Sequence, residues 1–202
     1  MSNKFYTARG DDGYTGLLGE GRVPKYDPRP EAFGTVDEAT SAMGLARATI
    51  QSERNRRVLL ESQRHLYCIM AELACTPETI KTFECLGADK VEWLETHTDA
   101  VAAEVKLPRE FIVPGDSLPG ATLDLARAVV RRAERVVVKL YHDGRVGYNG
   151  VVPGTPLRGV PNAATNPHII RYLNRLSSLL FVMARHEDAL AGVSTVTLAT
   201  EA

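Results

Sequence analysis

Apolar residues recur at steps of three and four positions through most of this 202-residue chain, and this spacing constrains the fold more than any other feature. Such spacing places apolar side chains on one face of an α-helix. The stretches that carry it are 30–50, 55–75, 91–105, 119–140 and 166–183. The pattern predicts one all-α domain over residues 1–202, folded as a five-helix up-and-down bundle.

Proline and capping residues set the expected helix ends. Pro30 suits the first turn of the first helix, and Pro108 stops the third. The fifth helix has the clearest start, because Asn166 is a favourable N-cap and Pro167 can occupy the first helical position. Glycine and proline crowd the stretch 142–165, which excludes a helix there and predicts a long loop with room for a short hairpin.

Net charge and hydropathy exclude several classes of protein. The formal net charge of -1 gives no overall field that would attract nucleic acid. No apolar run is long enough to cross a bilayer, and Met1–Phe5 lacks the apolar core of a secretory signal. We therefore expect a cytoplasmic protein that binds neither nucleic acid nor membrane.

The cysteines and histidines show no metal-binding spacing. Cys68, Cys75 and Cys85 form no C-x-x-C pair, and an odd number of cysteines favours reduced thiols. Cys68 and Cys75 lie in an apolar helical stretch and are expected to be buried. The histidines are scattered, so we expect no metal ion held by protein ligands.

The N-terminal 28 residues lack hydrophobic periodicity. Glycines, hydroxyls, carboxylates and a lysine alternate between Tyr6 and Lys25. Such a segment can offer backbone N–H groups and a cation to a phosphate chain. It contains neither a Gly-Lys-Ser/Thr step nor a Gly-x-Gly-x-x-Gly turn. From the residues alone, a flexible arm and a phosphate cradle are about equally good interpretations.

The fourth predicted helix carries a row of arginines. Arg127, Arg131 and Arg135 recur every fourth residue and share one face, with Glu134 beside it. A solvated surface stripe is the favoured interpretation on residue type alone. The alternative is a polyphosphate clamp, because guanidinium groups match phosphate oxygens bidentately.

Three further residues have both a structural and a functional interpretation. Asp37 complements the dipole of the first helix, and it could also pair with an arginine. Asn174 is either an exposed helical residue or a contact to a base or phosphate. Phe111, just before the fourth helix, is either core or the wall of a site.

Taken together, these segments resemble the PduO-type ATP:cob(I)alamin adenosyltransferases. The matching blocks follow the family's order and are spread along nearly the whole chain: Tyr6–Leu17, Gly21–Arg29, Phe33–Glu38, Phe111–Gly115, Arg131–Arg135 and Tyr172–Phe181. The resemblance implies transfer of the 5′-deoxyadenosyl group of ATP to the cobalt of cob(I)alamin, with release of triphosphate. It also implies Mg²⁺ as a cofactor, a homotrimer with sites at subunit interfaces, and a reductase and a B12-dependent mutase as possible partners.

The resemblance also assigns roles to individual residues. It implies catalytic contributions from Lys25, Arg131 and Phe111, with Phe111 against the lower face of the corrin. It implies an intersubunit salt bridge between Asp37 and Arg127. The residues expected to bind ATP are Thr7, Gly10, Asp11, Gly13, Thr15, Gly16, Lys25, Arg131, Glu134 and Asn174.

The sequence departs from the family at three places and leaves two other classes open. The Gly/Pro-rich stretch 142–165 is longer than is usual in the family. Ala8-Arg9 replaces the commoner Arg-Thr, and Ser178 stands where the family usually has Asp. A corrinoid escort that hands adenosylcobalamin to a mutase is one alternative. A purely structural bundle with solvated arginines is the other.

Overall fold

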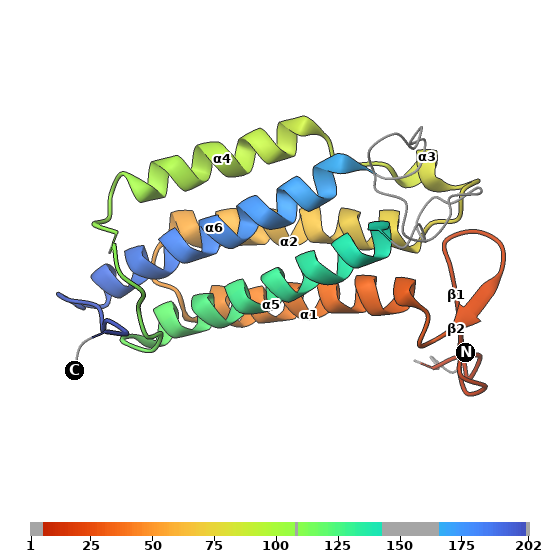
Figure 1. Ribbon diagram of the computed structural model, residues 1–202, viewed down its shortest axis with the longest axis horizontal. Coiled ribbons are helices and arrows are strands. Elements are labelled where there is room, and N and C mark those ends of the chain that lie inside the picture. The colour runs from red at the N-terminus through yellow and green to blue at the C-terminus, as the bar shows by residue number, and fades with distance from the viewer. Residues whose placement is uncertain (1–5, 108, 143–165, 201–202) are drawn as a thin grey trace, which may run out of the picture.

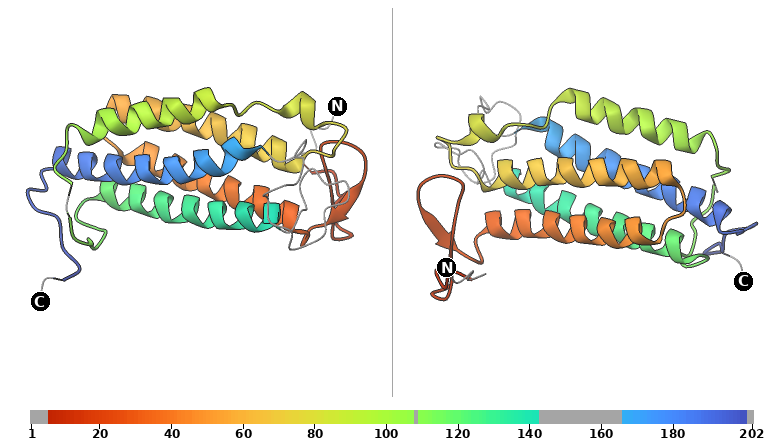
Figure 2. Two further views of the ribbon diagram at one scale, coloured as in Figure 1. Left: turned by 45° about the horizontal axis from the view of Figure 1, so that its top comes forward. Right: turned by 180° about the vertical axis from the view of Figure 1, so that it is seen from behind.

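The computed structural model describes residues 6–107, 109–142 and 166–200 (Figure 1). Its helices are α1 (Pro28–Thr49), α2 (Glu53–Ala74), the short α3 (Ile80–Phe83), α4 (Ala88–Ala102), α5 (Leu118–His142) and α6 (Pro167–Leu190). The five long helices alternate in direction along one axis (Figures 1 and 2). The predicted five-helix up-and-down bundle is therefore confirmed.

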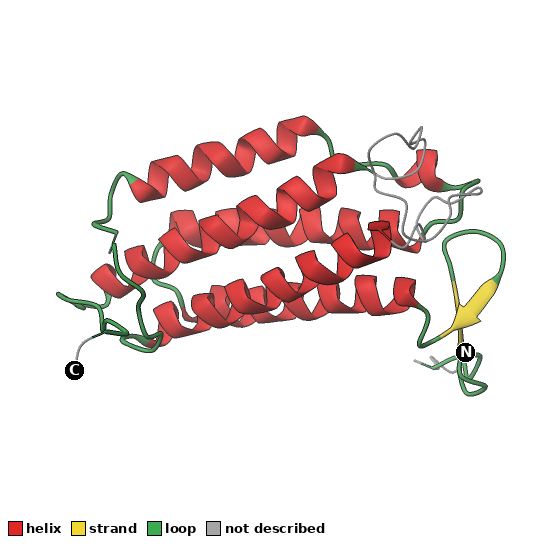
Figure 3. Ribbon diagram, in the orientation of Figure 1, coloured by secondary structure: helices red, strands yellow, loops and turns green. Residues whose placement is uncertain are grey.

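A small antiparallel hairpin precedes the bundle. Its strands are β1 (Tyr14–Gly16) and β2 (Arg22–Pro24), with Thr15 opposite Val23. Figure 3 shows the hairpin beside the end of the bundle where α1 begins, which we call the hairpin end. The opposite end, which we call the tail end, holds the α1–α2 turn, residues 103–107 and 109–117, and residues 191–200.

Local capping explains the observed helix ends. Asn166 accepts a hydrogen bond from the His168 backbone N–H, which confirms the predicted start of α6. α1 begins at Pro28, earlier than predicted, because the Asp27 side chain caps it. α4 ends at Ala102, so the predicted extension to residue 105 is wrong there. The predicted loop and its possible hairpin fall on residues 143–165, apart from His142, and these lie outside the described residues.

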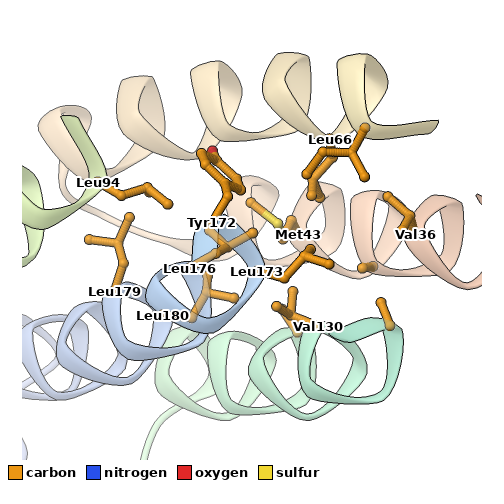
Figure 4. Close-up of a cluster of buried hydrophobic side chains, with 14 of the residues drawn as sticks. Val36, Met43, Leu66, Leu94, Val130, Tyr172, Leu173, Leu176, Leu179 and Leu180 are labelled. Carbon is orange, nitrogen blue, oxygen red and sulfur yellow. The ribbon is translucent and has the colours of Figure 1, made fainter. Parts of the chain in front are cut away.

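The core forms where the apolar stripes of the long helices meet. Figure 4 shows Met43 of α1, Leu66 of α2, Val130 of α5 and Leu173 of α6 converging on one another. All four side chains are fully buried. On the other side of α6, Leu94 of α4 approaches the same core. α6 therefore packs against the core shared with α1, α2 and α5 on one side and against α4 on the other, which explains its long apolar stripe.

A buried carboxylate fastens the α1–α2 turn to α6. Glu187 of α6 accepts hydrogen bonds from the backbone N–H groups of Gln51 and Ser52, at 2.7 and 3.3 Å. It also accepts one from the Asn55 amide at 2.7 Å. Glu187 is fully buried, so water cannot take its place as the acceptor for these three donors.

The cysteines differ from the sequence prediction. A disulfide joins Cys68 to Cys85, with Cα atoms 5.9 Å apart, so the expectation of reduced thiols is wrong for this pair. The chain folds back along α2 after α3, because Glu72 accepts the backbone N–H groups of Cys85 and Leu86. Cys75 is a buried free thiol, as predicted, and burial raises its pKa.

We predict that Glu187→Ala lowers the free energy of unfolding by about 2–5 kcal/mol, because it strands buried donors at the α1–α2 turn. Chemical denaturation followed by circular dichroism measures this change. Glu92→Ala, which removes an exposed glutamate from α4, is the control and should change little. Equal stability of the two variants would contradict the role given to Glu187.

Candidate functional site

An ion pair closes the Gly-rich turn of the N-terminal segment. Arg22 of β2 donates to both carboxylate oxygens of Asp12, at 2.7 and 2.8 Å. It also donates to the backbone carbonyls of Arg9 and Tyr14. The Arg22 guanidinium lowers the pKa of Asp12 to about 2. Sequence reasoning assigned Arg22 no role, although two opposite charges flanking a Gly-rich turn were a usable signal.

Lys25, the lysine predicted to bind phosphate, lies against this turn. The Lys25 backbone N–H donates to the Gly13 carbonyl at 2.9 Å, and Gly13 has a φ of +82° that favours glycine. A Cβ placed on Gly10 would lie 3.0 Å from the Lys25 ammonium nitrogen. The structure therefore brings together Gly10, Gly13 and Lys25, and it places Thr7, Asp11, Thr15 and Gly16 in the same hairpin segment.

The segment is anchored to the end of α2. The Leu18 backbone N–H donates to the Ala74 carbonyl at 2.8 Å, and the Thr76 N–H donates back to the Leu18 carbonyl at 3.2 Å. The Thr79 hydroxyl also donates to the Leu18 carbonyl. These contacts favour the cradle interpretation over a loose arm for the part of the segment that the structure describes.

The arginine row of α5 divides into fixed and exposed members. The Arg127 Nε donates to the Asp124 carboxylate at 3.1 Å. Arg131 and Arg135 are exposed, and no described residue accepts a hydrogen bond from Arg131. Arg132, one residue further, pairs with Glu38 of α1. Arg131 is thus a guanidinium available to an anion on the surface of α5.

Two predicted nucleotide contacts meet across α5 and α6. The Asn174 amide donates to Glu134 at 3.0 Å, and its carbonyl oxygen accepts from Arg175 at 2.8 Å. Arg175 is held in turn by Glu95 of α4 at 2.8 Å. This series of hydrogen bonds fixes the Glu134 and Asn174 side chains beside the arginine face.

Phe111 is exposed at the tail end. Its side chain is 86% exposed, so the core-packing interpretation is wrong. Its backbone is held by the C-terminal tail, since the Ala199 N–H donates to the Phe111 carbonyl and the Val113 N–H donates to the Thr197 carbonyl, both at 2.8 Å. The ring lines a cavity of about 300 Å³ with Arg109, Glu110, Ile112, Arg127 and Phe181.

The predicted intersubunit pair is not formed within one chain. Asp37 is exposed on α1, and the described part of the chain offers it no hydrogen-bonded or ion-pair partner. Arg127 uses Asp124 instead. The terminal nitrogens of Arg127 have no acceptor among the described residues, so the pairing with Asp37 of another copy stays a prediction.

The site residues are arranged along α5. Arg127 lines the Phe111 cavity, and Arg131 and Glu134 follow toward the hairpin end. At about 1.5 Å per residue, Arg127 and Glu134 lie about 10 Å apart along the helix. An elongated ligand could therefore contact the Phe111 cavity at one end and the arginine face further along.

Neither a metal cluster nor a membrane span was found in the described residues. Within them, no group of three or more His, Cys, Asp or Glu side chains could hold a metal ion. None of their helices is long and apolar enough to cross a membrane.

Comparison with known proteins shows the family. The family model described as cobalamin adenosyltransferase matches residues 5–187. The corrinoid adenosyltransferase of Bacillus subtilis is 36% identical over 197 residues, covering 96% of this chain and 91% of that protein. The corrinoid adenosyltransferase PduO of Salmonella typhimurium is 35% identical over 187 residues, and these cover 92% of this chain and 50% of that longer protein.

A solved structure agrees with these relatives. A variant PduO-type ATP:corrinoid adenosyltransferase from Lactobacillus reuteri, complexed with cobalamin and ATP, superimposes with a TM-score of 0.80 at 29% identity. The match covers 98% of this chain and 97% of that chain. The chain belongs to the cobalamin adenosyltransferase family.

We predict that Gly10→Ala weakens ATP binding, because the new methyl group would displace the Lys25 ammonium. Isothermal titration calorimetry of wild type, Gly10→Ala, Lys25→Gln and the double variant measures the effect. If Gly10 acts through Lys25, the double variant binds ATP no more weakly than Lys25→Gln alone. Additive losses would contradict this contact.

Proposed function

We propose that this chain is an ATP:corrinoid adenosyltransferase that converts cob(I)alamin and ATP to adenosylcobalamin and triphosphate. The observation that carries the proposal is the exposed Phe111 ring, which lines a cavity together with Arg127 of the arginine-bearing helix α5. Family membership supports the same reaction.

The cobalt of cob(I)alamin is the nucleophile in this reaction. Its electron pair attacks C5′ of ATP, the new Co–C5′ bond forms, and the C5′–O5′ bond breaks with its electrons passing to triphosphate. The substrate thus supplies the difficult chemistry, and the protein needs no nucleophile of its own. The task of the protein is to align C5′ with cobalt and to stabilise the charge on triphosphate.

The phosphate contacts would come from two places. One is the turn from Gly10 to Gly16, which the Asp12–Arg22 pair holds closed. Its amides at Asp11, Gly13 and Tyr14 already donate within the segment, so Lys25 would supply the main contact there. Arg131 on α5 supplies a guanidinium whose planar donors match phosphate oxygens. Glu134 and Asn174, which are hydrogen-bonded to each other, would contact the nucleoside.

Magnesium would be bound chiefly through the triphosphate. Mg²⁺ retains several waters and commonly binds substrate phosphates with one or two carboxylates. Asp11 is an exposed carboxylate in the phosphate turn, whereas Asp12 is engaged by Arg22. Asp11 therefore fits a magnesium contact, and the cation would offset phosphate charge when bound.

A trimer would complete the site. The terminal nitrogens of Arg127, which have no acceptor among the described residues, and the exposed Asp37 carboxylate are complementary surface groups, which supports a salt bridge between subunits. The Phe111 cavity of about 300 Å³ is also much smaller than a corrinoid, so most of the substrate would need contacts elsewhere. A neighbouring subunit is the expected source of those contacts.

The setting of the reaction fits a cytoplasmic enzyme, because ATP is its co-substrate. A reductase would supply cob(I)alamin, and a B12-dependent mutase would use the product. The strongly reducing substrate supports the reductase, and the mutase is one kind of enzyme that could use the product.

Anaerobic incubation with ATP, Mg²⁺ and chemically reduced cobalamin tests the proposed function. We expect the spectrum of a light-sensitive cobalt–carbon product to appear without any acceptor protein. Binding of both ligands without turnover would favour the escort alternative. Failure to bind ATP would favour the structural bundle.

We predict that Arg131→Ala lowers turnover in this assay by about 100-fold or more, because charge develops on the leaving triphosphate. The circular dichroism melting curve should change little, since Arg131 is exposed. Arg64→Ala is the control, because its side chain is an exposed arginine of α2. Turnover of the Arg131 variant within a few-fold of wild type would identify the arginine row as a solvated stripe.

We predict that Phe111→Ala changes the coordination of bound Co(II)cobalamin. With ATP present, the wild-type ring should exclude a lower ligand and give a four-coordinate electron paramagnetic resonance signal, whereas the variant should give mainly five-coordinate cobalt. Tyr67→Ala, which removes another exposed ring, is the control. A four-coordinate signal that persists in Phe111→Ala would contradict this role.

A further inference from the structure

A buried ionic cluster contacts two residues that line the Phe111 cavity, Arg127 and Phe181. Arg185 of α6 donates to Asp124 of α5 at 2.6 Å and to Asp188 at 2.9 Å, and all three side chains are at most 4% exposed. Ser117, just before α5, donates to the other oxygen of Asp188 at 2.5 Å. The cluster therefore joins α5 and α6 at the tail end.

The charge of this cluster is unbalanced without Arg127. Asp124 and Asp188 carry two negative charges and Arg185 carries one positive charge, which leaves the buried groups at -1. A buried carboxylate that lacks full compensation is costly. Arg127 supplies the missing charge from the rim, through its Nε atom at 3.1 Å from Asp124. The cluster thus attracts Arg127 and holds it.

The direction of this contact matters for the cavity. Asp124 binds Arg127 through Nε alone, so the two terminal nitrogens keep no acceptor among the described residues. Arg127 lines the cavity that contains Phe111. Phe181, another lining residue, lies over Arg185, with the guanidinium carbon 5.4 Å from its ring centroid. The cluster therefore contacts two of the residues that line the cavity, Arg127 and Phe181.

We propose that Asp124 is a positioning residue for the corrinoid end of the site. By fixing Nε of Arg127, it turns the terminal guanidinium nitrogens outward, toward the corrinoid substrate or toward a carboxylate of a neighbouring subunit. This inference rests on the proposed adenosyltransferase function. Asp124 itself is buried, so it would act on the substrate only through Arg127.

Two isosteric variants separate positioning from stability. Asp124→Asn and Asp188→Asn each remove one buried carboxylate charge next to Arg185, but only the first changes the partner of Arg127. We expect both to lower the melting temperature. At a temperature below the melting transitions of both variants, Asp124→Asn should reduce kcat/KM for cob(I)alamin by about 10- to 100-fold, because the Arg127 guanidinium would be misplaced. Asp188→Asn should lose clearly less, because it leaves the acceptor of the Arg127 Nε–H in place. Equal losses in the two variants would overturn the proposal.

A double-variant cycle tests whether Asp124 acts through Arg127. If it does, Asp124→Asn combined with Arg127→Met has the same kcat/KM as Arg127→Met alone. Losses that multiply would overturn the proposal, because Asp124 would then act by another route.

A measurement without substrate keeps this inference distinct from the proposed function. In nuclear magnetic resonance of the ligand-free protein, the Nε–H of Arg127 should exchange slowly with solvent in wild type and rapidly in Asp124→Asn. Rapid exchange in wild type would overturn the inference even if turnover is observed. Absence of turnover in wild type, with a protected Nε–H, would instead contradict the proposed function and the corrinoid role of Asp124 but leave the contact itself in place.

Discussion

The burial of α6 against α2, α4 and α5 is the interaction on which the rest of the structure depends. Leu173 and Leu176 lie in the main core, while Leu179 faces Leu94 of α4 (Figure 4). Burying a leucine or isoleucine side chain contributes about 1.5–3 kcal/mol, so this stripe is a large part of the driving force for folding. Its position also determines where Asn174 and Arg185 lie, because both follow from the helical period of the same segment.

Buried polar contacts then determine how the ends of the bundle are arranged. Glu187 ties the α1–α2 turn to α6, and Glu72 ties the connection after α3 to α2. At the tail end, the Asp124–Arg185–Asp188 cluster joins α5 to α6. Apolar packing alone is not directional, whereas these hydrogen bonds require particular partners. They therefore convert a generic bundle into one with defined turns, and at the tail end they support a candidate substrate cavity.

Much of the candidate site could be predicted from sequence, but its contacts could not. The Gly-rich turn with Lys25 was identified because its residue types cannot form a core, and the arginine face followed from four-residue spacing. The Asp12–Arg22 clasp and the Asp124–Arg127 contact were missed, because an ion pair depends on rotamers and on competing partners. The Cys68–Cys85 disulfide was missed for a related reason, since the chain must first fold back on α2.

The sequence by itself determined the all-α class, the approximate position of each long helix and the N-cap of α6, because periodicity and capping are local properties of the chain. It could not decide whether Phe111 packs inside or faces solvent, since both are compatible with an aromatic residue before a helix. The tertiary structure decided this, because the C-terminal tail pairs with the backbone of that segment and leaves the ring exposed. Contacts between residues distant in the sequence form only once the helices have packed, which is why the tertiary structure alone decided how the walls of the cavity are held.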